Sequence, residues 1–574
     1  MFKIGFYHAN TLYFEKLENT LFLSVAAIYF KTHVEINAPD IACQLEWIRP
    51  IQKQISDQEL IDYCNNNNLD MLAISMYLWN ENYIKNQLQR IKNKISSKCK
   101  IIVGGPSVDV NINDQYFTQH DYADFAIYGP GEVAFTDLLT HLVLGKRIIP
   151  FNVSNIAWVD KQKNKLIVAD YKNVPQSKVS PFLYNEEFFT LIVKHEQQQN
   201  GVYVVLPWEL TRGCPYSCTF CDWNSGLSNK VTRRKGTYKD EIDLFHKLEI
   251  KKIYFSDANF GQYEEDIEIV EYLVYKNLHE NAGFKTDGNL SKLKKDNNLK
   301  IYHMFAQGNL VHKGWGFTFS VQDTNETVLQ NIERPDVGWD VHKKMILELS
   351  EHHPQYLSKV QFIIGLPGQT PQTIIESLSQ IIDLPNVVLS PFISELLPAS
   401  PAGRDPEYQQ KFNFQYSSSE RINQSGLTFR GKFPANCYSF NNKEFVEMIV
   451  ITSFMSGLAR LREEINFKEL TVLKNTKIIV NKFLASAQFK FLCDNLYNNW
   501  INKDKFYYTI DFDHQEKILP GCNMVVTGIK WVNSISFKKM LLELNLENIA
   551  KNNLYKKIMT RNLILDDWFV EDTV

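Results

Sequence analysis

The sequence lacks an excess of charge of one sign and a long hydrophobic run. Its 574 residues include 62 Lys or Arg and 65 Asp or Glu, for a net charge of -3. No global basic field therefore exists to hold a nucleic-acid backbone. The longest early apolar run, residues 21–30, is broken by Ser24. It is far shorter than the roughly 18 residues that a membrane span needs.

Cysteine is also scarce. Nine cysteines in so long a chain are too few for a disulfide scaffold, so their spacing must be considered instead. No basic segment precedes the apolar run and no small-residue cleavage site stands out, which argues against a secretory signal. We therefore expect a cytoplasmic protein with reduced thiols. The composition, 44% hydrophobic and 22% charged residues, excludes a disordered or fibrous chain.

Short apolar runs alternate with amphipathic stretches over the first 150 residues. Expected strands are residues 4–7, 45–49, 71–75, 101–103 and 126–128. Strands that alternate with helices predict a doubly wound parallel sheet covered on both faces. Ligands of such sheets bind at the C-terminal ends of the strands. The segments 75–80, 104–106 and 129–132 are therefore candidate ligand loops.

The alternation of strands and helices resumes after residue 201. Expected strands are residues 202–206, 252–256, 301–305, 316–321, 360–364 and 388–395. Six strand–helix units fit a partial (β/α)6 barrel better than a complete eight-unit barrel. The α/β chain is thus divided into a sheet domain (1–150), a linker (151–200), a barrel (201–405) and a mainly helical or α+β C-terminal domain (406–574). Residues 155–168 are compatible with a hairpin, and residues 415–424 are expected to form a polar loop.

The strongest local signal is a loop with Cys214, Cys218 and Cys221. Three thiolates at this spacing suit three irons of a [4Fe–4S] cluster and leave the fourth iron open to a substrate or cofactor. A zinc site is one alternative, but structural zinc normally has four Cys or His ligands, and the next His is His246. Three unrelated buried cysteines are another. Ligand spacing and softness favour the cluster.

The residues around this loop, 207–223, resemble the cluster loop of radical SAM enzymes. In that superfamily S-adenosylmethionine (SAM) chelates the open iron and is cleaved to a 5′-deoxyadenosyl radical. Four further parts of the chain match the superfamily in the expected order: residues 256–261, 320–322 with 332–334, 365–370 and 395–401. Residues 365–370 match its "GLPGET" turn, with Gln369 in place of Glu.

The resemblance implies that several side chains contact SAM. They are Phe220, Asp257, Asn259, Ser320, Gln322 and Gly365. Simpler explanations remain open, since Asp257 and Asn259 can cap a helix and Gly365 can merely shape a turn. The basic run at residues 230–235 is typical of a solvated face. Its alternative role is to face the carboxylate of SAM or of an acidic substrate.

The N-terminal sheet resembles the cobalamin-binding domain that precedes many radical SAM barrels. Residues 75–80 are close to the "S-x-Y-x-W-N" signature of that group. The implied cobalamin-binding residues are Ser75, Tyr77, Leu78, Trp79, Asn80, Gly104, Gly105, Gly129, Gly131 and Glu132. Glycines let a large ring or its nucleotide tail approach the backbone closely, although Trp79 could simply pack between domains. His8 lacks the Asp-x-His-x-x-Gly context of cobalt ligands, so no His ligand below cobalt is predicted.

The implied cofactors are therefore a [4Fe–4S] cluster, SAM and cobalamin. With them the resemblance predicts an enzyme that methylates an unactivated carbon of a peptide or other natural product through methylcobalamin. A cobalamin-dependent cyclase or rearrangement enzyme is the second hypothesis, and a non-catalytic cobalamin or iron–sulfur sensor is the third. The implied partners are a small-molecule or peptide substrate and an electron donor such as flavodoxin or ferredoxin, with no nucleic acid and no membrane. The residues alone indicate no protein acid or base.

Overall fold

The structure is a computed structural model, and it describes most of the chain up to residue 510. The description covers residues 1–510, 518 and 519, apart from 11–19, 78, 109–111, 113, 147, 149–151, 161–164, 176, 200, 222, 224–230, 312–315, 335–337, 398–399, 423–427, 465–475 and 504–508. None of the helices in this part has the length and hydropathy required of a membrane-spanning helix.

The N-terminal domain is built on a seven-stranded sheet with the strand order β3-β1-β4-β5-β6-β7-β8. The first five strands in that order run parallel, and β7 and β8 are antiparallel additions. The strands are β1 (Phe2–Tyr7), β3 (Leu45–Trp47), β4 (Met71–Ser75), β5 (Lys100–Gly104), β6 (Phe125–Ile127), β7 (Ile156–Asp160) and β8 (Lys165–Val168). Each of the five strands predicted in this region is present.

Helices cover both faces of this sheet. They are α1 (Ala26–Asn37), α2 (Pro39–Ala42), α3 (Asp57–Asn66), α4 (Glu81–Ile91), α5 (Asp114–Gln119) and α6 (Glu132–Val143), with a 3-10 turn at Lys92–Lys94. In β4, Met71 and Ala73 pack with α1 and α6, whereas Leu72 and Ile74 pack with α3 and α4. Burial on both faces explains why the parallel strands are uninterrupted apolar runs. The predicted doubly wound sheet is confirmed.

The segment expected as a linker contributes to both neighbouring domains. The suggested hairpin is present as β7 and β8, which extend the N-terminal sheet. Two helices follow, α7 (Pro181–Tyr184) and α8 (Glu186–Gln199). Phe182 and Phe189 are completely buried and belong to the same hydrophobic core as the barrel strands. Residues 181–199 thus pack as part of the barrel wall.

The barrel has six parallel strands and one additional parallel edge strand, divided between two sheets. One sheet has the order β13-β12-β9-β2 and the other the order β14-β15-β16. The strands are β2 (Thr20–Phe22), β9 (Tyr203–Trp208), β12 (Lys252–Phe260), β13 (Lys285–Leu290), β14 (Phe317–Gln322), β15 (Ser358–Ile364) and β16 (Val387–Ile393). β2 comes from the N-terminal region and pairs in parallel with β9. The partial (β/α)6 barrel is confirmed, with this additional edge strand.

The third barrel strand was predicted at the wrong place. Residues 301–305 belong to α11 (Lys295–Gln307), and the third strand is β13. Ile301, Tyr302 and Phe305 are buried on one side of the helix, a spacing that in a short window also looks like an apolar strand. β13 reads Lys-Thr-Asp-Gly-Asn-Leu and is mostly half-buried, so hydrophobicity gave no indication of it.

Helices surround the barrel and continue into the C-terminal region. They are α9 (Tyr238–Lys247), α10 (Glu264–His279), α12 (Glu326–Asn331), α13 (Trp339–His352), α14 (Pro371–Ile382), α15 (Pro401–Arg404), α16 (Pro406–Lys411), α17 (Asn442–Glu464), α18 (Thr476–Leu484) and α19 (Ala487–Lys503). The long helix α17 packs on α14 and β16. The polar loop expected at 415–424 is wrong: β17 (Gln415–Ile422) pairs with β18 (Thr428–Asn436), and a short pair, β19 (Thr509–Ile510) and β20 (Ile518–Leu519), follows.

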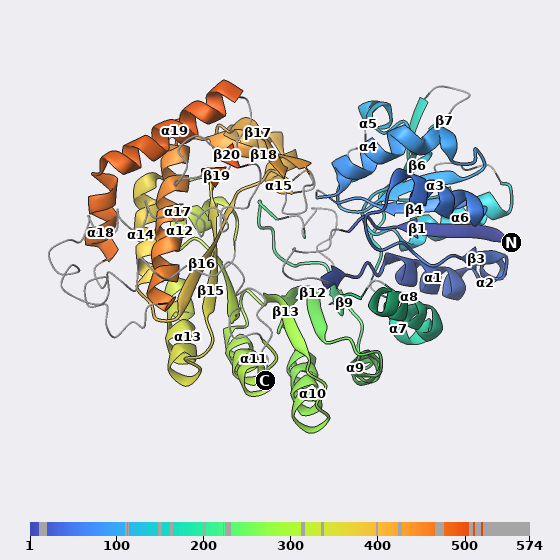
Figure 1. Ribbon diagram of the computed structural model, residues 1–574, viewed down its shortest axis with the longest axis horizontal. Coiled ribbons are helices and arrows are strands. Elements are labelled where there is room, and N and C mark those ends of the chain that lie inside the picture. Colours follow the sequence, from blue (N-terminus) through green and yellow to red (C-terminus); the bar gives the residue numbers. More distant parts are fainter. Residues whose placement is uncertain are drawn as a thin grey trace.

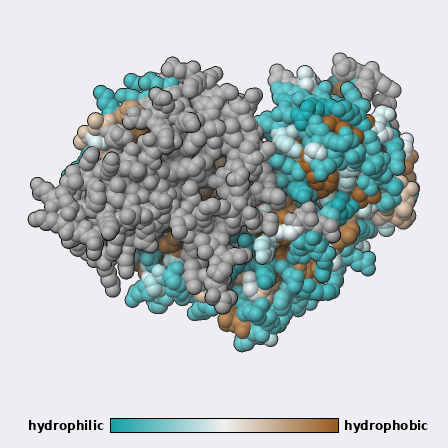
Figure 2. Space-filling model, in the orientation of Figure 1, coloured by the Kyte–Doolittle hydropathy of each residue, from teal (hydrophilic) through white to brown (hydrophobic). Residues whose placement is uncertain are grey.

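Figure 1 shows the N-terminal domain on one side of the barrel and helices α17–α19 on the other. The β17–β18 hairpin reaches across, and β18 contacts α4 of the N-terminal domain. On the face shown in Figure 2, the coloured surface is largely hydrophilic with scattered apolar patches. The described C-terminal region therefore connects the two domains above the strand ends of the barrel.

Candidate active site

The cysteine loop follows β9 and is closed at its base by a short antiparallel pair. β10 (Thr211–Arg212) precedes the cysteines and pairs with β11 (Thr232–Arg233). Cys214 and Cys218 are both 2% exposed, and Cys221 is half-buried. The fold thus places three cysteines on one loop beyond the end of the first barrel strand.

Thr219 fixes the middle of this loop. Its backbone N–H donates to the carbonyl of Ile332 at 3.0 Å, and its carbonyl accepts from Ala402 N–H at 2.8 Å. Its hydroxyl donates to the Tyr408 hydroxyl at 2.9 Å, which donates in turn to the Asn331 carbonyl at 3.0 Å. The loop is therefore held by α12, α15 and α16 at once, which limits its freedom independently of any bound group.

Asp257, predicted to contact SAM, is engaged with the backbone of the loop base. Its Oδ1 accepts from the N–H groups of Leu210 at 2.8 Å and Thr211 at 3.0 Å. Its Oδ2 lies 3.8 Å from an Arg233 nitrogen. Burial raises the pKa of Asp257 to about 7, and the two backbone donors oppose that shift. These contacts give Asp257 a clear role in positioning the loop, and its contact with SAM stays a prediction.

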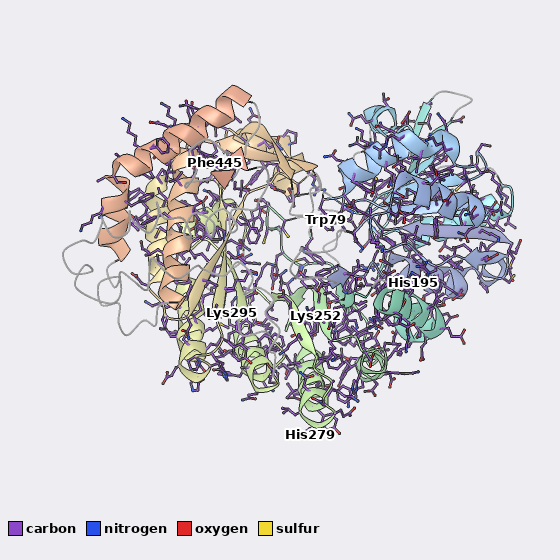
Figure 3. The ribbon with its side chains drawn as sticks, viewed as in Figure 1. Trp79, His195, Lys252, His279, Lys295 and Phe445 are labelled. Atoms are coloured by element: carbon purple, nitrogen blue, oxygen red, sulfur yellow. The ribbon has the colours of Figure 1, made fainter. Side chains whose placement is uncertain are left out.

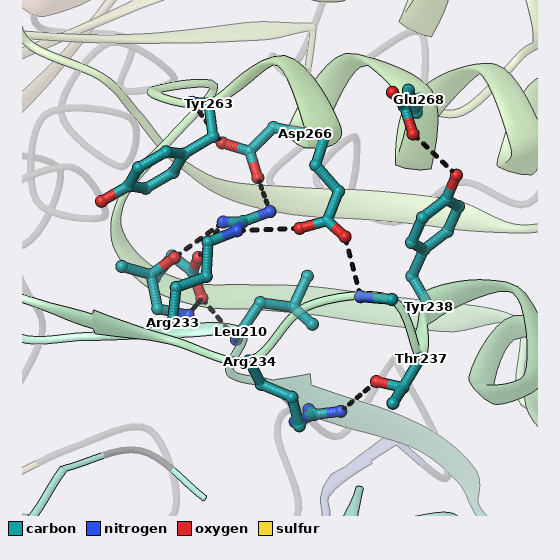
Figure 4. Close-up of polar contacts among 12 residues, drawn as sticks. Leu210, Arg233, Arg234, Thr237, Tyr238, Tyr263, Asp266 and Glu268 are labelled. Atoms are coloured by element: carbon teal, nitrogen blue, oxygen red, sulfur yellow. Dashed lines mark hydrogen bonds and ion pairs between the residues drawn. The ribbon is translucent and has the colours of Figure 1, made fainter. Parts of the chain in front are cut away.

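Two of the four cations in the basic run after the cysteines, Arg233 and Arg234, are paired inside the protein, whereas Lys235 is exposed and Lys230 lies outside the described residues. Arg233 donates to Glu265 at 3.0 Å, to Asp266 at 2.6 Å and to the Thr211 hydroxyl at 2.7 Å (Figure 4). Arg234 is 1% exposed and pairs with Glu241. These two cations therefore anchor the base of the loop. They are neither a solvated face nor free to meet a carboxylate.

Cys214 is contacted by residues from the next two barrel strands. Asn259, at the end of β12, donates from Nδ2 to Cys214 Sγ at 3.2 Å. Lys292, just after β13, donates to Asn259 Oδ1 at 3.1 Å and lies 4.0 Å from the same sulfur. Burial raises the pKa of the Cys218 thiol, while the charges of Arg334 and Lys292 oppose that rise. The structure thus places Asn259 beside Cys214, while its contact with SAM stays a prediction, and it adds Lys292, which had no signal in the sequence.

Phe220 lies on a small apolar cluster at the ends of α12 and β15. Its ring packs against buried members of that cluster, Val328, Leu329, Ile332, Ile363 and Leu366. The side chain remains half-buried. A face of the ring is therefore supported from behind, as an aromatic stacking surface requires.

Ser320 and Gln322 lie on β14, one strand further around the barrel. The Ser320 hydroxyl donates to Gln361 Oε1 at 2.6 Å, and its carbonyl accepts from Arg334. Gln322 is 8% exposed and has a φ of +71°, which is uncommon for a residue with a side chain. Its Oε1 is buried without a hydrogen-bond partner. An orphaned buried acceptor is costly, so a ligand that donates a hydrogen bond to Gln322 would be favourable.

Gly365 opens the turn after β15. Its φ of +92° requires glycine, and its N–H donates to Gln369 Oε1 at 2.8 Å. Gln369 is fully buried and donates to Asp323 at 2.6 Å. From the C-terminal region, the Ser439 hydroxyl accepts from Gly368 N–H at 2.9 Å. Gly365 therefore shapes the turn after β15, which was one of the two roles considered for it. Ser439 also supports this turn, and nothing in the sequence indicated that it would.

The loop after β4 is closed by Asn80, which is fully buried. Its Oδ1 accepts from Tyr77 N–H at 2.8 Å and its Nδ2 donates to the Ser75 carbonyl at 3.2 Å. The Ser75 hydroxyl lies 2.8 Å from Nδ1 of His8, which follows β1 and is 1% exposed. His8 is therefore hydrogen-bonded at Nδ1, while its Nε2 is buried without a hydrogen-bond partner. Leu78 lies outside the described residues.

Tyr77 and Trp79 form the exposed part of this loop. Their rings stack with centroids 4.4 Å apart and an interplanar angle of 15°. Trp79 is 41% exposed, and Figure 3 places it on the side of the N-terminal domain that faces the barrel. Tyr77 is half-buried behind Trp79, so the exposed Trp79 ring is held by the stack and could pack against a flat ligand.

The four candidate glycines lie at the ends of β5 and β6. Gly105 has a φ of +111°, and a Cβ there would meet the Met76 carbonyl oxygen at 2.5 Å, so only glycine fits against the neighbouring loop. Gly104 ends β5, and Gly129 and Gly131 follow β6 just before α6. All four therefore lie at the same edge of the sheet as Trp79.

Glu132 has a partner in the barrel domain. Its Oε1 accepts from Arg212 at 2.7 Å, and Arg212 also donates to Glu209 at 2.8 Å. The side chains of Glu132, Arg212 and Glu209 are 11%, 19% and 21% exposed. We call these three residues the interdomain bridge. Through it, Glu132 of a predicted cobalamin loop contacts Arg212, which lies two positions before Cys214. No role for Arg212 was predicted from the sequence.

The surroundings of the cysteines bear on which metal group they could hold. Among the described residues, no three His, Cys, Asp or Glu side chains converge as a mononuclear metal site would need. Cysteines that bind a cluster each hold a separate iron. With two buried sulfurs, an amide donor and nearby cations, the loop has the ligands and the positive surroundings that an anionic iron–sulfur group requires.

The comparisons with known proteins agree with this geometry. The family model described as "Radical SAM superfamily" matches residues 208–381. The cobalamin-dependent radical SAM methyltransferase TokK of Streptomyces tokunonensis is 26% identical over 378 residues, which cover 65% of this chain and 53% of TokK. The 2-(S-pantetheinyl)-carbapenam-3-carboxylate methyltransferase of Streptantibioticus cattleyicolor is 25% identical with the same coverage. The chain therefore spans about half the length of these curated relatives.

A solved structure supports the fold of the part of the chain described above. The cobalamin-dependent S-adenosylmethionine radical enzyme OxsB, with aqua-cobalamin and S-adenosylmethionine bound, superposes with a TM-score of 0.57 at 14% identity. The match covers 97% of this chain and 81% of OxsB. Residues 208–381 of this chain thus match the radical SAM family model, they are preceded by an α/β domain, and the fold is similar to that of OxsB.

Proposed function

We propose that the protein is a cobalamin-dependent radical SAM methyltransferase that methylates an unactivated carbon. The observation that carries the proposal is the interdomain bridge. Arg212, two residues before Cys214, is paired with Glu132 at the C-terminal edge of the N-terminal sheet. The candidate cluster loop and the candidate cobalamin edge are therefore joined by direct contact, as methyl transfer between two cofactors would require.

The residues of the barrel fit the cluster and SAM. Cys214, Cys218 and Cys221 would hold the cluster, and Thr219 fixes the loop between them. Phe220 offers a supported aromatic surface for the adenosyl portion of SAM. The orphaned Oε1 of Gln322 would accept a hydrogen bond from the same ligand.

The residues of the N-terminal domain fit cobalamin. The Tyr77–Trp79 stack would pack against the corrin, and Asn80 holds that loop in shape. Gly105 allows close approach of backbone to ligand. When bound together, the three cofactors supply reductive cleavage of SAM and delivery of methyl to carbon. The protein's own contribution is to orient these groups and to exclude water between the domains.

The substrate proposal is a peptide or other small natural product. One relative is named for a carbapenam carboxylate, which is a small molecule. The chain has near-neutral net charge, which favours neither nucleic acid nor a strongly charged polymer. An external reductant such as flavodoxin or ferredoxin would supply the electrons.

The test uses the full chain purified without oxygen, with cobalamin supplied during expression. SAM with a deuterated methyl group is added with a reductant and a panel of peptide and carbapenam-type acceptors. We expect 5′-deoxyadenosine and a product that carries the deuterated methyl. Formation of 5′-deoxyadenosine with a rearranged product free of label would establish the cyclase hypothesis instead. No 5′-deoxyadenosine from a protein with its full iron and cobalt content would favour the sensor.

A variant separates the two halves of the proposal. Trp79→Ala should reduce cobalamin retention and methyl transfer while 5′-deoxyadenosine formation continues, because the cluster loop is untouched. Undiminished methyl transfer with bound cobalamin in this variant would remove the Tyr77–Trp79 stack from the proposed cobalamin site.

A further inference from the structure

Lys292 is a charged residue beside the cysteine loop that no motif identifies. It follows β13 by two residues, and its side chain is half-buried. The Nζ atom donates to Asn259 Oδ1 at 3.1 Å and lies 4.0 Å from Cys214 Sγ. It also lies 5.1 Å from the centre of the Tyr216 ring, which belongs to the cysteine loop. Three contacts therefore direct one cation to the first cysteine.

The order of these contacts gives Lys292 a defined effect on Asn259. An amide group carries an acceptor on one side and a donor on the other. Because Lys292 occupies the oxygen, the Asn259 NH2 group is turned to Cys214 Sγ, to which it donates at 3.2 Å. Lys292 thus acts on the sulfur in two ways, by its own charge and by fixing the amide donor.

Both effects favour the more negative state of a cluster bound to Cys214. Hydrogen bonds to the sulfur ligands and local net charge are among the terms that set the reduction potential of iron–sulfur clusters. A positive charge held a few ångströms from the sulfur, at the boundary of the protein interior, is screened less than it would be in water. Adding one electron to the cluster is therefore easier with Lys292 than without it.

We propose that Lys292 is a positioning residue that raises the reduction potential of the cluster through Asn259 and the Cys214 sulfur. The inference rests on the proposed function only in requiring that the cluster is present. It assigns to the third barrel strand a role in controlling electron entry. It also gives a function to a lysine that lies half-buried beside a buried thiol.

The test is an EPR-monitored redox titration of anaerobically reconstituted protein. Lys292→Met removes the charge with little change in length and should disfavour reduction about tenfold, which corresponds to a midpoint about 59 mV lower for a one-electron couple. Lys292→Arg keeps the charge and should stay near the wild-type value. Lys294→Met is the matched control, because Lys294 is exposed on the same segment and should leave the potential unchanged.

Iron content and SAM binding are measured on the same samples. If Lys292→Met does not retain its cluster, Lys292→Gln, which keeps a donor but no charge, replaces it in the titration. An unchanged potential in a charge-free variant with full iron overturns the inference. So does a loss of SAM affinity without a potential shift, which would assign Lys292 to SAM. A wild-type protein that binds no cluster refutes the proposed function itself, and is thereby distinguished from a failure of this inference.

Discussion

Replacing Arg212 by methionine probes a mostly buried ion-pair contact between the two domains. Arg212 donates to Glu132 at 2.7 Å and to Glu209 at 2.8 Å, and all three side chains are mostly buried. The neighbouring carboxylates keep the pKa of Arg212 above its usual range, so its charge is permanent. Methionine fills a similar volume but leaves two carboxylates facing each other without a cation.

The magnitude follows from burial. Removing one partner of a fully buried ion pair costs about 3–5 kcal/mol, because the remaining charge is left desolvated. The side chains of Glu132 and Glu209 are 11% and 21% exposed, so they are not fully desolvated. We therefore expect Arg212→Met to lower the free energy of opening by about 2–3 kcal/mol. The control is Arg90→Met. Arg90 makes a similar two-bond contact with Asp57 at 2.8 and 2.9 Å, but its side chain is 56% exposed. Such a surface pair is worth about 0.2–1 kcal/mol.

The assay is native-state hydrogen exchange, because a chain with several domains does not unfold in two states. Opening free energies are compared at the amides of β10 and of the first turn of α6. The double variant Glu132→Gln, Arg212→Met should lose less opening free energy than the two single variants lose together. The difference, which is the coupling energy, should be about 1 kcal/mol or more. An effect of Arg212→Met no larger than that of Arg90→Met, or strict additivity, would refute the reasoning.

Two other predictions concern the N-terminal domain. Trp79→Ala should weaken binding of hydroxocobalamin about tenfold by equilibrium titration, since the aromatic contact is worth roughly 1 kcal/mol or more; Tyr275→Ala, exposed to a similar extent on α10, should have no effect. Burial lowers the pKa of His8 to about 3 from 6.5, so below pH 6.5 the unfolded state binds a proton that the folded state does not. Stability at β1 should therefore fall by about 1.4 kcal/mol per pH unit below pH 6.5, and His8→Gln should flatten that slope in hydrogen exchange corrected for the intrinsic rate. A pH-independent opening free energy at β1 in the wild type would contradict this assignment.

The sequence predicted the fold where burial leaves a simple pattern. Strands such as β4 are buried on both faces, so their residues are continuously apolar and easily recognised. β13 failed this criterion because its residues are polar and mostly half-buried. The buried apolar residues at 301–305 of α11 were therefore mistaken for the third strand. The β17–β18 hairpin was missed for a related reason, since its first strand is a run of serines and charged residues.

The candidate site was predictable to the extent that its residues belong to a motif. The cysteines and Phe220 follow from local spacing and family resemblance. Lys292 could not be found because it follows the strand that hydrophobicity missed. Arg212 was visible in the sequence, but its partner Glu132 is 80 residues away, and only the fold brings them together. Asp257 illustrates the opposite case, because the contacts of its carboxylate with the loop backbone are not evident from the motif.

The most direct test of the central claim compares the wild-type protein with Cys218→Ala after identical anaerobic reconstitution. Iron, sulfide and reductant-dependent 5′-deoxyadenosine are measured on both. The wild type should bind about four irons, as three thiolates of a [4Fe–4S] site imply, and should cleave SAM. Cys218→Ala should lose most of the cluster and all of the cleavage. Full iron content and full cleavage in Cys218→Ala would contradict the assignment of Cys214, Cys218 and Cys221 as the cluster ligands of a radical SAM site.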